Sequence, residues 1–415
     1  MKNKKIIILG GGFAGLQLAR KLNKKAFDII LIDKLNYHQF QPLFYQVATA
    51  RLDPANISFP FRKIFQKSKN IQIRLTEVTE IVAANNIIKT TIGNFDYDYL
   101  VIATGCKTNF FGNEQISKYA YSMKTTQEAI NIRNEILLSF EQFICSTEEE
   151  KEALINIIIV GAGPTGVELA GAFAEMKKNI LPKDYPKIDF SKLSVTILEG
   201  SKNTLNSMSI QSQKASLKYL LDMGVKIRTE VFVTDYDGTT VTLNTKEKIK
   251  SKNVIWAAGV AGNIIDGLSS DSVFKNRFVV DRYNKVKNYA NIFAIGDIAY
   301  MITNKYPYAH PQLANVAINQ GKNLANNFIA MHQNKTLQEY EYNDLGSMAT
   351  IGKYKAVVDM RNLKFQGRLA WFIWMFLHLM LILSIRNKFL TFINWTWNFL
   401  TKDSSLRLIF KNNKN

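Results

Sequence analysis

One stretch near the start decides the fold of this chain: Ile6-Ile7-Ile8-Leu9-Gly10-Gly11-Gly12-Phe13-Ala14-Gly15. An apolar β-strand pattern leads into spaced glycines, and an apolar helical pattern follows from Leu16 to Leu22. In such a unit the first glycine permits a tight turn, the second lets a phosphate approach the backbone, and the third lets helix and strand pack closely. The helix start offers free N–H groups to that phosphate. A second strand, Asp28–Asp33, ends in an acid that can bind a ribose hydroxyl, so this unit is predicted to bind a dinucleotide.

The same pattern returns at Gly161, which lies 151 residues after Gly10. A buried strand leads into Gly161-Ala162-Gly163-Pro164-Thr165-Gly166, and the following strand, Ser194–Glu199, again ends in an acid. The strand that ends in Ala103-Thr104-Gly105 has its counterpart in the strand that ends in Ala257-Ala258-Gly259. Because an internal repeat reports a repeated structural unit, we predict an α/β fold with two Rossmann-like dinucleotide-binding domains.

Two dinucleotide units in one chain imply two dinucleotides, whose useful joint chemistry is hydride transfer between a nicotinamide and a flavin. Asp297 follows a predicted strand and fits a second contact to the first nucleotide, at a ribityl hydroxyl. A surface Gly-Asp turn is the alternative, and the first fingerprint weighs against it. In the second unit Glu199 would repel a 2′-phosphate, which favours NADH over NADPH, although Lys202 nearby could tolerate that phosphate.

These patterns divide the chain into expected domains. Residues 1–112 and 276–330 are expected to form an FAD-binding domain, and residues 113–275 an NADH-binding domain. Residues 331–415 are expected to form a C-terminal hairpin and amphipathic helices that anchor the chain to a membrane. Ile71–Ala83 and Ile87–Ile92 alternate around Asn85-Asn86, which predicts a hairpin within the first domain.

The charge of the chain points to an anionic partner. The net charge is +19, and the candidates are nucleic acid, a membrane surface and nucleotide ligands. From residue 361 to the end there are nine basic residues and a single acid, Asp403, in the most apolar and Trp-rich part of the sequence. Basic, aromatic and apolar residues together indicate an anionic membrane surface and not nucleic acid.

Two apolar segments form this tail. Leu369–Ile385 has seventeen residues without a formal charge, which is the lower edge of the length of a membrane-spanning helix, about 17–25 residues. Phe389–Leu400 carries polar residues at helical spacing, which predicts an interfacial amphipathic helix with Trp at headgroup depth. These polar residues are Thr391, Asn394 and Asn398. We expect two helices lying in one leaflet, and a spanning first segment is the alternative.

The cysteines and the start of the chain bear on the compartment. Cys106 and Cys145 do not have the spacing of a metal site or a redox motif. We therefore expect a reducing compartment, and we expect neither a disulfide framework nor a metal site. The basic start, Met1–Lys5, is followed by only four apolar residues. That run is too short for a signal peptide, so the start is expected to stay in the cytoplasm.

Glu168 lies in the first turns of the second predicted dinucleotide helix. An acid there is favoured by the helix dipole alone. The alternative is a carboxylate at the interface between nicotinamide and flavin. Spacing alone favours the first interpretation.

Several segments together resemble the type II NADH:quinone oxidoreductases, the alternative NADH dehydrogenases. The likeness covers nearly the whole chain, and the first loop and the tail are specific to that family. The segments are Asn36-Tyr37-His38 with Phe40–Thr49, Gly161–Glu168, Trp256–Val260, Gly346–Gly352, Trp371–His378 and Arg386-Asn387.

The resemblance implies a non-pumping, monotopic enzyme on the cytoplasmic face of the cell inner membrane, usually a homodimer. NADH would reduce bound FAD, and the flavin would reduce a membrane quinone. By position, Glu168 corresponds to the family's catalytic glutamate beside the nicotinamide. The quinone head is expected near Gln41, Pro42 and Leu43 and near two asparagines, Asn315 and Asn319, where the family usually carries glutamines. An asparagine is one methylene shorter but keeps the same amide donor and acceptor.

Contacts to the two dinucleotides are expected from both fingerprints and the segments that return to them. The expected FAD contacts are Gly10, Gly11, Gly12, Phe13, Ala14, Gly15, Asp33, Lys34, Val78, Thr104, Gly105, Asp297, Ala314 and Asn315. The expected NADH contacts are Gly161, Gly163, Gly166, Glu199, Ala258 and Gly259.

Three other functions remain to be weighed. A dithiol disulfide reductase needs two close cysteines after the first acid, and Lys34–Leu52 contains none. A sulfide:quinone oxidoreductase would share the membrane tail but needs cysteines for sulfur transfer and no NADH site, whereas the second fingerprint with Glu199 is intact. A redox-inert membrane scaffold predicts that no flavin is bound.

Overall fold

The computed structural model describes residues 3–404 and 406–410. Met1, Lys2, Lys411 and Lys414, which contribute to the basic termini noted above, lie outside these residues. The chain forms two compact units, unit 1 with residues 1–39, 59–107 and 260–343, and unit 2 with residues 40–58, 108–259 and 344–415. It passes between them in β10 (Cys106–Thr108) and at the start of β18 (Val260–Gly262). Each unit contains a parallel sheet, so the predicted α/β fold is confirmed.

Unit 1 is built on a five-stranded parallel sheet in the order β21-β9-β1-β2-β5. Its strands read as continuous apolar runs because both faces of a parallel sheet are covered. Ile6, Ile7 and Ile8 of β1 are completely buried. The bounds are β1 (Lys4–Leu9), β2 (Phe27–Asp33), β5 (Ile71–Leu75), β9 (Tyr99–Ile102) and β21 (Ile292–Ala294).

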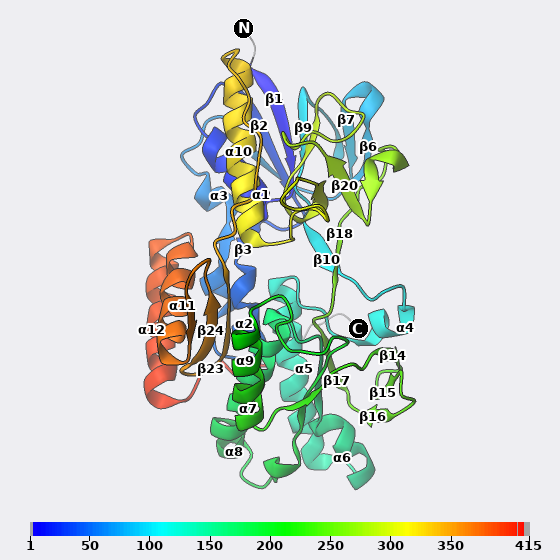
Figure 1. Cartoon of the computed structure of the whole chain (residues 1–415), viewed down its shortest axis with the longest axis vertical. Coiled ribbons are helices and arrows are strands. Elements are labelled where there is room, and N and C mark those ends of the chain that lie inside the picture. Colours follow the sequence, from blue (N-terminus) through cyan, green and yellow to red (C-terminus); the bar gives the residue numbers. More distant parts are fainter. Residues whose placement is uncertain (1–2, 405, 411–415) are drawn as a thin grey trace. The chain divides into compact units, whose positions relative to one another are not determined.

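Helix α1 (Phe13–Leu22) packs along α10 (Ala314–His332), as Figure 1 shows. The two backbones approach so closely that a Cβ on Gly321 would lie 2.5 Å from the carbonyl oxygen of Ala14. A glycine in α10 therefore brings this helix up to the start of α1, where the first fingerprint lies.

The predicted hairpin of unit 1 is confirmed, but its first strand is shorter than predicted. Strands β6 (Val78–Val82) and β7 (Ile87–Thr90) are antiparallel, and Asn86 takes a left-handed conformation, with φ of 53°, in the turn. The prediction of one strand over Ile71–Ala83 was wrong, because β5 belongs to the parallel sheet and ends at Leu75. The alternating pattern has the same period in both strands and does not show where the chain changes sheet.

Shorter elements complete unit 1. They are β3 (Tyr37–Gln39), β4 (Ser58–Pro60), α3 (Phe61–Ile64), β8 (Gly93–Asp96), β19 (Val273–Phe274), β20 (Arg277–Val280) and β22 (Ala299–Met301). Strand β4 begins at Ser58, one residue before the segment 59–107 of unit 1.

Unit 2 is built on a four-stranded parallel sheet in the order β13-β12-β11-β17. Helix α7 (Pro164–Asn179) follows β11 and also packs against β23. A Cβ on Gly171 would lie 2.1 Å from the carbonyl oxygen of Ile351, so this glycine permits the approach of α7 to β23. The strands of the unit are β11 (Ile157–Val160), β12 (Val195–Leu198), β13 (Lys226–Arg228), β14 (Val233–Tyr236), β15 (Thr240–Leu243), β16 (Lys248–Lys250), β17 (Asn253–Trp256), β23 (Ser347–Gly352), β24 (Lys355–Asp359) and β25 (Lys364–Gln366).

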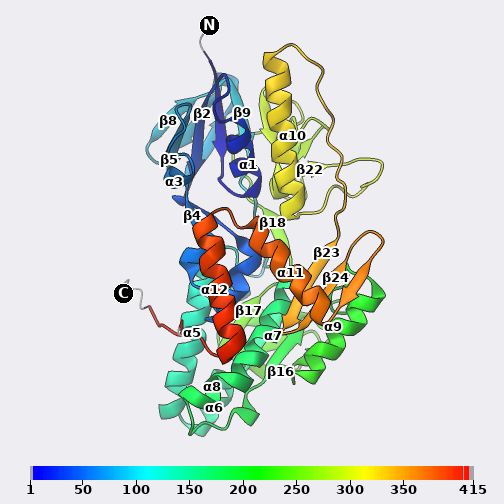
Figure 2. The same ribbon diagram turned by 90° about the vertical axis from the view of Figure 1, so that its left-hand side faces the viewer.

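The helices of unit 2 surround this sheet and the β23–β25 sheet. They are α2 (Phe44–Ala48), α4 (Glu114–Tyr119), α5 (Thr126–Cys145), α6 (Glu148–Ile155), α8 (Leu181–Asp184), α9 (Ile210–Asp222), α11 (Arg368–Leu381) and α12 (Ile385–Thr401). Figure 2 shows α11 and α12 against unit 2, where α11 contacts β24 and α12 contacts the short helix Pro54–Ile57.

The apolar segment Leu369–Ile385 is not one helix, contrary to the prediction from its charge-free length. Helix α11 ends at Leu381, Ile382 is extended, and α12 begins at Ile385. Two helices in the tail are therefore confirmed. Among the described residues, none of the helices combines the length and the hydropathy needed to cross a membrane.

Of the predicted polar stripe of α12, Thr391 and Asn398 face the protein, and Asn394 is half-buried. Asn387, which the predicted stripe did not include, also faces the protein. Asn387 Nδ2 donates to the carbonyl oxygen of Ala55 at 2.9 Å, and Asn398 Nδ2 donates to that of Arg51 at 2.8 Å. Thr391 is completely buried between them. The opposite face is apolar and exposed, with Trp397 60% and Leu400 71% accessible. This helix thus turns its polar side inward and its apolar side outward.

Candidate functional site

The first fingerprint lies in the turn between β1 and α1. Gly10 has φ of +100°, and a Cβ there would lie 2.4 Å from the carbonyl oxygen of Ala103. A Cβ on Gly15 would lie 2.0 Å from the carbonyl oxygen of Gly10, whereas one on Gly12 would meet nothing within 4 Å. No side chain caps the start of α1 at Gly12, and the space beside Gly12 is open. This arrangement fits the pyrophosphate of a dinucleotide.

Asp33, at the end of β2, closes this turn. Its Oδ2 accepts a hydrogen bond from the N–H of Gly11 at 2.6 Å, and its Oδ1 accepts one from the N–H of Leu35 at 2.8 Å. Burial raises the pKa of Asp33, and the backbone N–H groups oppose that rise. Each carboxylate oxygen keeps a lone pair that a ribose hydroxyl can use.

Two side chains to which the sequence gave no role hold Gly11 in place. Burial lowers the pKa of His38 to about 4, so its ring is neutral near pH 7. The ring Nδ1 lies 2.9 Å from the carbonyl oxygen of Gly11, and because a carbonyl only accepts, Nδ1 carries the proton. Phe61 lies over the same glycine, where a Cβ would come within 2.1 Å of its ring.

The remaining predicted FAD residues all belong to unit 1. Thr104 Oγ1 donates to the carbonyl oxygen of Asn263 at 2.7 Å, next to Gly105 with φ of +67°. Cys106 Sγ donates to Asp297 Oδ2 at 3.0 Å. Lys34 forms an ion pair with Glu77 on the surface. Phe13 and Ala14 open α1, Val78 opens β6, and Ala314 and Asn315 open α10.

A buried amide that the sequence analysis missed positions Asp297. Gln320 Oε1 accepts a hydrogen bond from the N–H of Gly296 at 2.7 Å. Gly296 has φ of +77°, so the turn before Asp297 is held by a side chain of α10. Asn315 and Asn319 lie on this helix, four residues apart and half-buried.

The second fingerprint repeats the geometry of the first. Gly161 has φ of +104°, a Cβ on Gly166 would lie 1.9 Å from the carbonyl oxygen of Gly161, and one on Gly163 would meet nothing within 4 Å. Glu199 Oε2 accepts from the N–H of Ala162 at 2.5 Å, as Asp33 does from that of Gly11. The start of α7 likewise has no side-chain cap. A second dinucleotide therefore fits here, with the strand end Ala258-Gly259 beside it.

Glu168 lies one turn into α7 and faces a cavity. Its Oε1 accepts a hydrogen bond from the N–H of Thr350 at 3.4 Å. Burial raises the pKa of Glu168 to about 8, although the Thr350 N–H and the side chain of Trp374 both lower it. Trp374 is buried, and its indole Nε1 makes no hydrogen bond of normal geometry within the described part of the chain. At neutral pH the Glu168 carboxyl is therefore mainly protonated.

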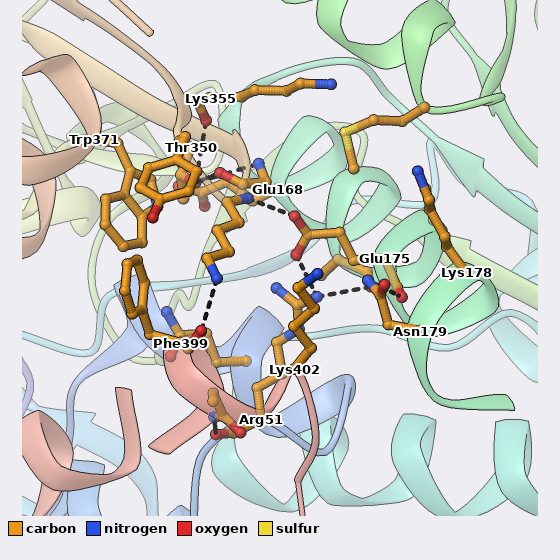
Figure 3. Close-up of a pocket in the computed structure, with 18 of the residues that line it drawn as sticks. Arg51, Glu168, Glu175, Lys178, Asn179, Thr350, Lys355, Trp371, Phe399 and Lys402 are labelled. Carbon is orange, nitrogen blue, oxygen red and sulfur yellow. Dashed lines mark hydrogen bonds and ion pairs between the residues drawn. The ribbon is translucent and has the colours of Figure 1, made fainter. Parts of the chain in front are cut away.

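The cavity beside Glu168 has a volume of about 700 Å³ and lies wholly within unit 2. Its walls come from α2, α7, the end of α9, α11, α12 and the β23–β24 hairpin, and Figure 3 shows part of this lining. Gln46 links two of these walls, because its Oε1 accepts from Trp395 Nε1 at 2.7 Å while its Nε2 donates to Tyr45 Oη at 2.9 Å. This volume is typical of sites for small molecules.

The predicted quinone residues are divided between the two units. Gln41, Pro42 and Leu43 form a short 3₁₀ helix in unit 2, in which Gln41 is exposed and Leu43 is buried. Asn315 and Asn319 belong to unit 1. A quinone site that uses both groups therefore stays a prediction.

Comparisons with known proteins agree with this geometry. The pyridine nucleotide-disulphide oxidoreductase family matches residues 4–321, and the NDH2 C-terminal domain matches residues 345–402. The type II NADH:quinone oxidoreductase Ndh of Mycobacterium tuberculosis is 33% identical over 420 residues, covering 96% of this chain and 89% of that protein. That of Staphylococcus haemolyticus is 28% identical and covers 89% of this chain and 92% of that protein.

Solved structures show the same fold. NDH2 from Plasmodium falciparum in complex with NADH superposes with a TM-score of 0.91 at 23% identity, covering 99% of this chain and 100% of that one. The sulfide:quinone oxidoreductase from Aquifex aeolicus superposes with a TM-score of 0.74 at 19% identity, covering 96% of each chain. It shares the fold but is the more distant match, which disfavours the sulfide alternative. The chain belongs to the type II NADH:quinone oxidoreductases, FAD-dependent enzymes that oxidise NADH and reduce a quinone.

Proposed function

We propose that the fingerprint of unit 1 holds FAD and that of unit 2 holds NADH. One repeated observation supports two dinucleotide sites, and Asp297, which belongs to unit 1 and fits a ribityl hydroxyl, favours FAD in that unit. In both units an acid at the end of the second strand accepts a hydrogen bond from the N–H that follows the first glycine, Asp33 from Gly11 and Glu199 from Ala162. The middle glycine stays open in both. The domain assignment, with FAD on residues 1–112 and 276–330 and NADH on residues 113–275, rests on the same repeat.

When bound, FAD accepts a hydride from NADH and delivers two electrons to the quinone. The chain contributes position and protonation. The open helix starts at Gly12 and Gly163 bind phosphates, and Asp33 and Glu199 bind ribose hydroxyls. Glu168, protonated near pH 7, presents a carboxyl that can both donate and accept a hydrogen bond, so it can orient the nicotinamide carboxamide. An ionised Glu168 could only accept hydrogen bonds.

We further propose that the enzyme docks on an anionic membrane through α11 and α12 without crossing it, on the cytoplasmic face. The outward face of both helices supports this proposal, since Phe376 is 62% exposed on α11 and Trp397 60% on α12. Large exposed apolar patches mark membrane or protein interaction sites. Arg386 and Lys388, at the start of α12, can meet lipid phosphates. Family membership supports a homodimer, and the quinone site near Gln41–Leu43, Asn315 and Asn319 belongs to the same proposal.

The nucleotide preference can be tested at Glu199. Glu199→Gln removes the charge that would repel a 2′-phosphate while keeping the length of the side chain. We expect the ratio of kcat/KM for NADPH to that for NADH to rise about tenfold, equal to about 1.4 kcal/mol. Glu152→Gln, at an exposed acid on α6, is the control and should leave the ratio unchanged. An unchanged ratio in Glu199→Gln would remove Glu199 from the ribose site.

The role of Glu168 can be tested by pH dependence. Because the pKa of Glu168 is raised to about 8, the carboxyl is protonated below that pH and ionises above it. We expect the rate of flavin reduction by NADH to be constant at neutral pH and to fall as pH rises through about 8. Glu168→Gln cannot ionise, so its rate should stay flat across this range while FAD remains bound. The same alkaline fall in Glu168→Gln would show that another group titrates.

Membrane docking can be tested on the outer face of α12. Phe392→Asp with Trp397→Asp should weaken binding to phosphatidylglycerol-containing vesicles by at least about tenfold, because burying each such side chain contributes about 1.5–3 kcal/mol. Co-sedimentation measures this loss, and the FAD content should not change. Ile210→Asp, at an exposed apolar residue of α9, serves as the control. Wild-type binding by the double variant would refute the proposed surface.

A further inference from the structure

The cavity of unit 2 has a basic end to which the proposed catalysis assigns no role. Glu175 lies two turns after Glu168 on α7, about 10 Å further along the helix. Around it the cavity wall carries a basic cluster, which we define as Arg51, Lys178, Lys353 and Lys402. These residues come from four separate parts of unit 2: the segment after α2, helix α7, the β23–β24 turn and the end of α12. Figure 3 labels Arg51, Lys178 and Lys402.

The carboxylate of Glu175, which lies within this cluster, already has partners. Glu175 forms an ion pair with Arg51, and it also accepts a hydrogen bond from the backbone N–H of Lys353. Both of its oxygens therefore have partners, and both partners lie at the cavity. Glu175 holds Arg51 in place and neutralises one charge of the cluster.

Positive charge remains after the other acids of the wall are counted. Asp403 pairs with Arg407 through Oδ1 and Nη1 at 2.6 Å, and Asp222 is the remaining ionised acid. Glu168 is mainly protonated near pH 7 because burial raises its pKa. With Lys355, whose ammonium lies over the ring of Tyr219, the wall carries five cations against three ionised carboxylates.

Two of the cations oppose each other directly. Burial lowers the pKa of Lys353, and the charge of Lys402 lowers it further. Lys353 Nζ donates to the carbonyl oxygen of Phe399 at 2.7 Å and lies 4.0 Å above the centre of its ring. Among the residues that the structure describes, the ammonium groups of Lys178 and Lys402 have neither a hydrogen-bond nor an ion-pair partner. An anion between Lys353 and Lys402 would relieve their repulsion.

The surroundings of the cluster favour an anion that carries an apolar part. Trp371 and Phe399 line the cavity beside the lysines and pack against each other, with ring centres 5.9 Å apart. Lys402 follows α12 directly, two residues after Leu400, which is exposed on the apolar outer face. A headgroup at Lys402 would therefore lie close to the surface that we propose to enter the membrane.

We propose that this basic end of the cavity binds a phosphate-bearing anion, either the headgroup of an anionic phospholipid or a free phosphate. Lys353 and Lys402 bind the phosphate oxygens, and Lys178 adds long-range attraction. Arg51 stays paired with Glu175. The lipid source rests on the proposed docking of α11 and α12, whereas the phosphate chemistry of the site does not.

The test is isothermal titration of the FAD-loaded full chain in a non-ionic detergent. The two probes are dihexanoyl phosphatidylglycerol and inorganic phosphate, so no vesicle is involved and a failure of membrane docking cannot be mistaken for a failure of this site. We expect saturable binding of one probe molecule per chain. Binding of phosphatidylglycerol that inorganic phosphate does not displace identifies a lipid headgroup, and equal binding of both identifies a general phosphate site.

Variants locate the binding. Lys353→Gln with Lys402→Gln should weaken it at least about tenfold, since two charge-assisted hydrogen bonds to the phosphate are lost. Lys402→Gln alone removes neither a hydrogen bond nor an ion pair among the described residues, so we expect it to fold normally and to lose affinity only through the site. Lys214→Gln with Lys248→Gln changes the net charge equally at exposed positions elsewhere in unit 2 and should bind normally. Absence of saturable binding by either probe, wild-type affinity in the cavity variants, or an equal loss in the control would overturn the proposal.

Discussion

The close approach of a helix start to a strand end is the constraint on which this molecule depends. In each unit the third fingerprint glycine faces the carbonyl oxygen of the first, where a Cβ would lie only 2.0 Å away in unit 1 and 1.9 Å in unit 2. No residue with a side chain can take either position without moving the helix. The packing leaves the middle glycine uncovered and aims the first N–H groups of the helix outward. Both proposed dinucleotide sites therefore depend on backbone packing, and the acids Asp33 and Glu199 would complete them.

The C-terminal helices are the proposed connection between this redox chemistry and the membrane. Helix α12 keeps Asn387 and Asn398 on the inside, where they bind backbone carbonyls of the segment 40–58. Trp395 is buried, whereas Phe389, Phe392 and Trp397 are left outside. A surface helix of a soluble protein would instead bury its apolar side chains and expose its polar ones. The cavity beside Glu168 reaches from α7 to these helices, so one cavity contacts both the proposed catalytic carboxyl and the proposed membrane-docking elements.

Local patterns in the sequence predicted the two fingerprints, the acids that close them and the tail helices, because each depends on neighbouring residues. The boundary at Leu75 and the break after Leu381 were missed, since apolar periodicity does not report a change of sheet or the end of a helix. The raised pKa of Glu168 could not be predicted either. It arises from burial by segments distant in the sequence, and the two groups that oppose the rise, Thr350 and Trp374, lie about 180 and 210 positions away. His38 and Gln320 were missed for the same reason, as their partners Gly11 and Gly296 are distant in sequence.

Anaerobic absorption spectroscopy of the purified holoenzyme tests the central claim most directly. NADH is added first, the visible band of the oxidised flavin is followed, and a water-soluble quinone is then supplied. We expect rapid bleaching by NADH and full recovery of the band with the quinone, which would establish both half-reactions in one sample. A flavin band that NADH leaves unchanged would contradict the assignment of the second fingerprint to NADH. Bleaching without recovery would contradict the quinone half-reaction.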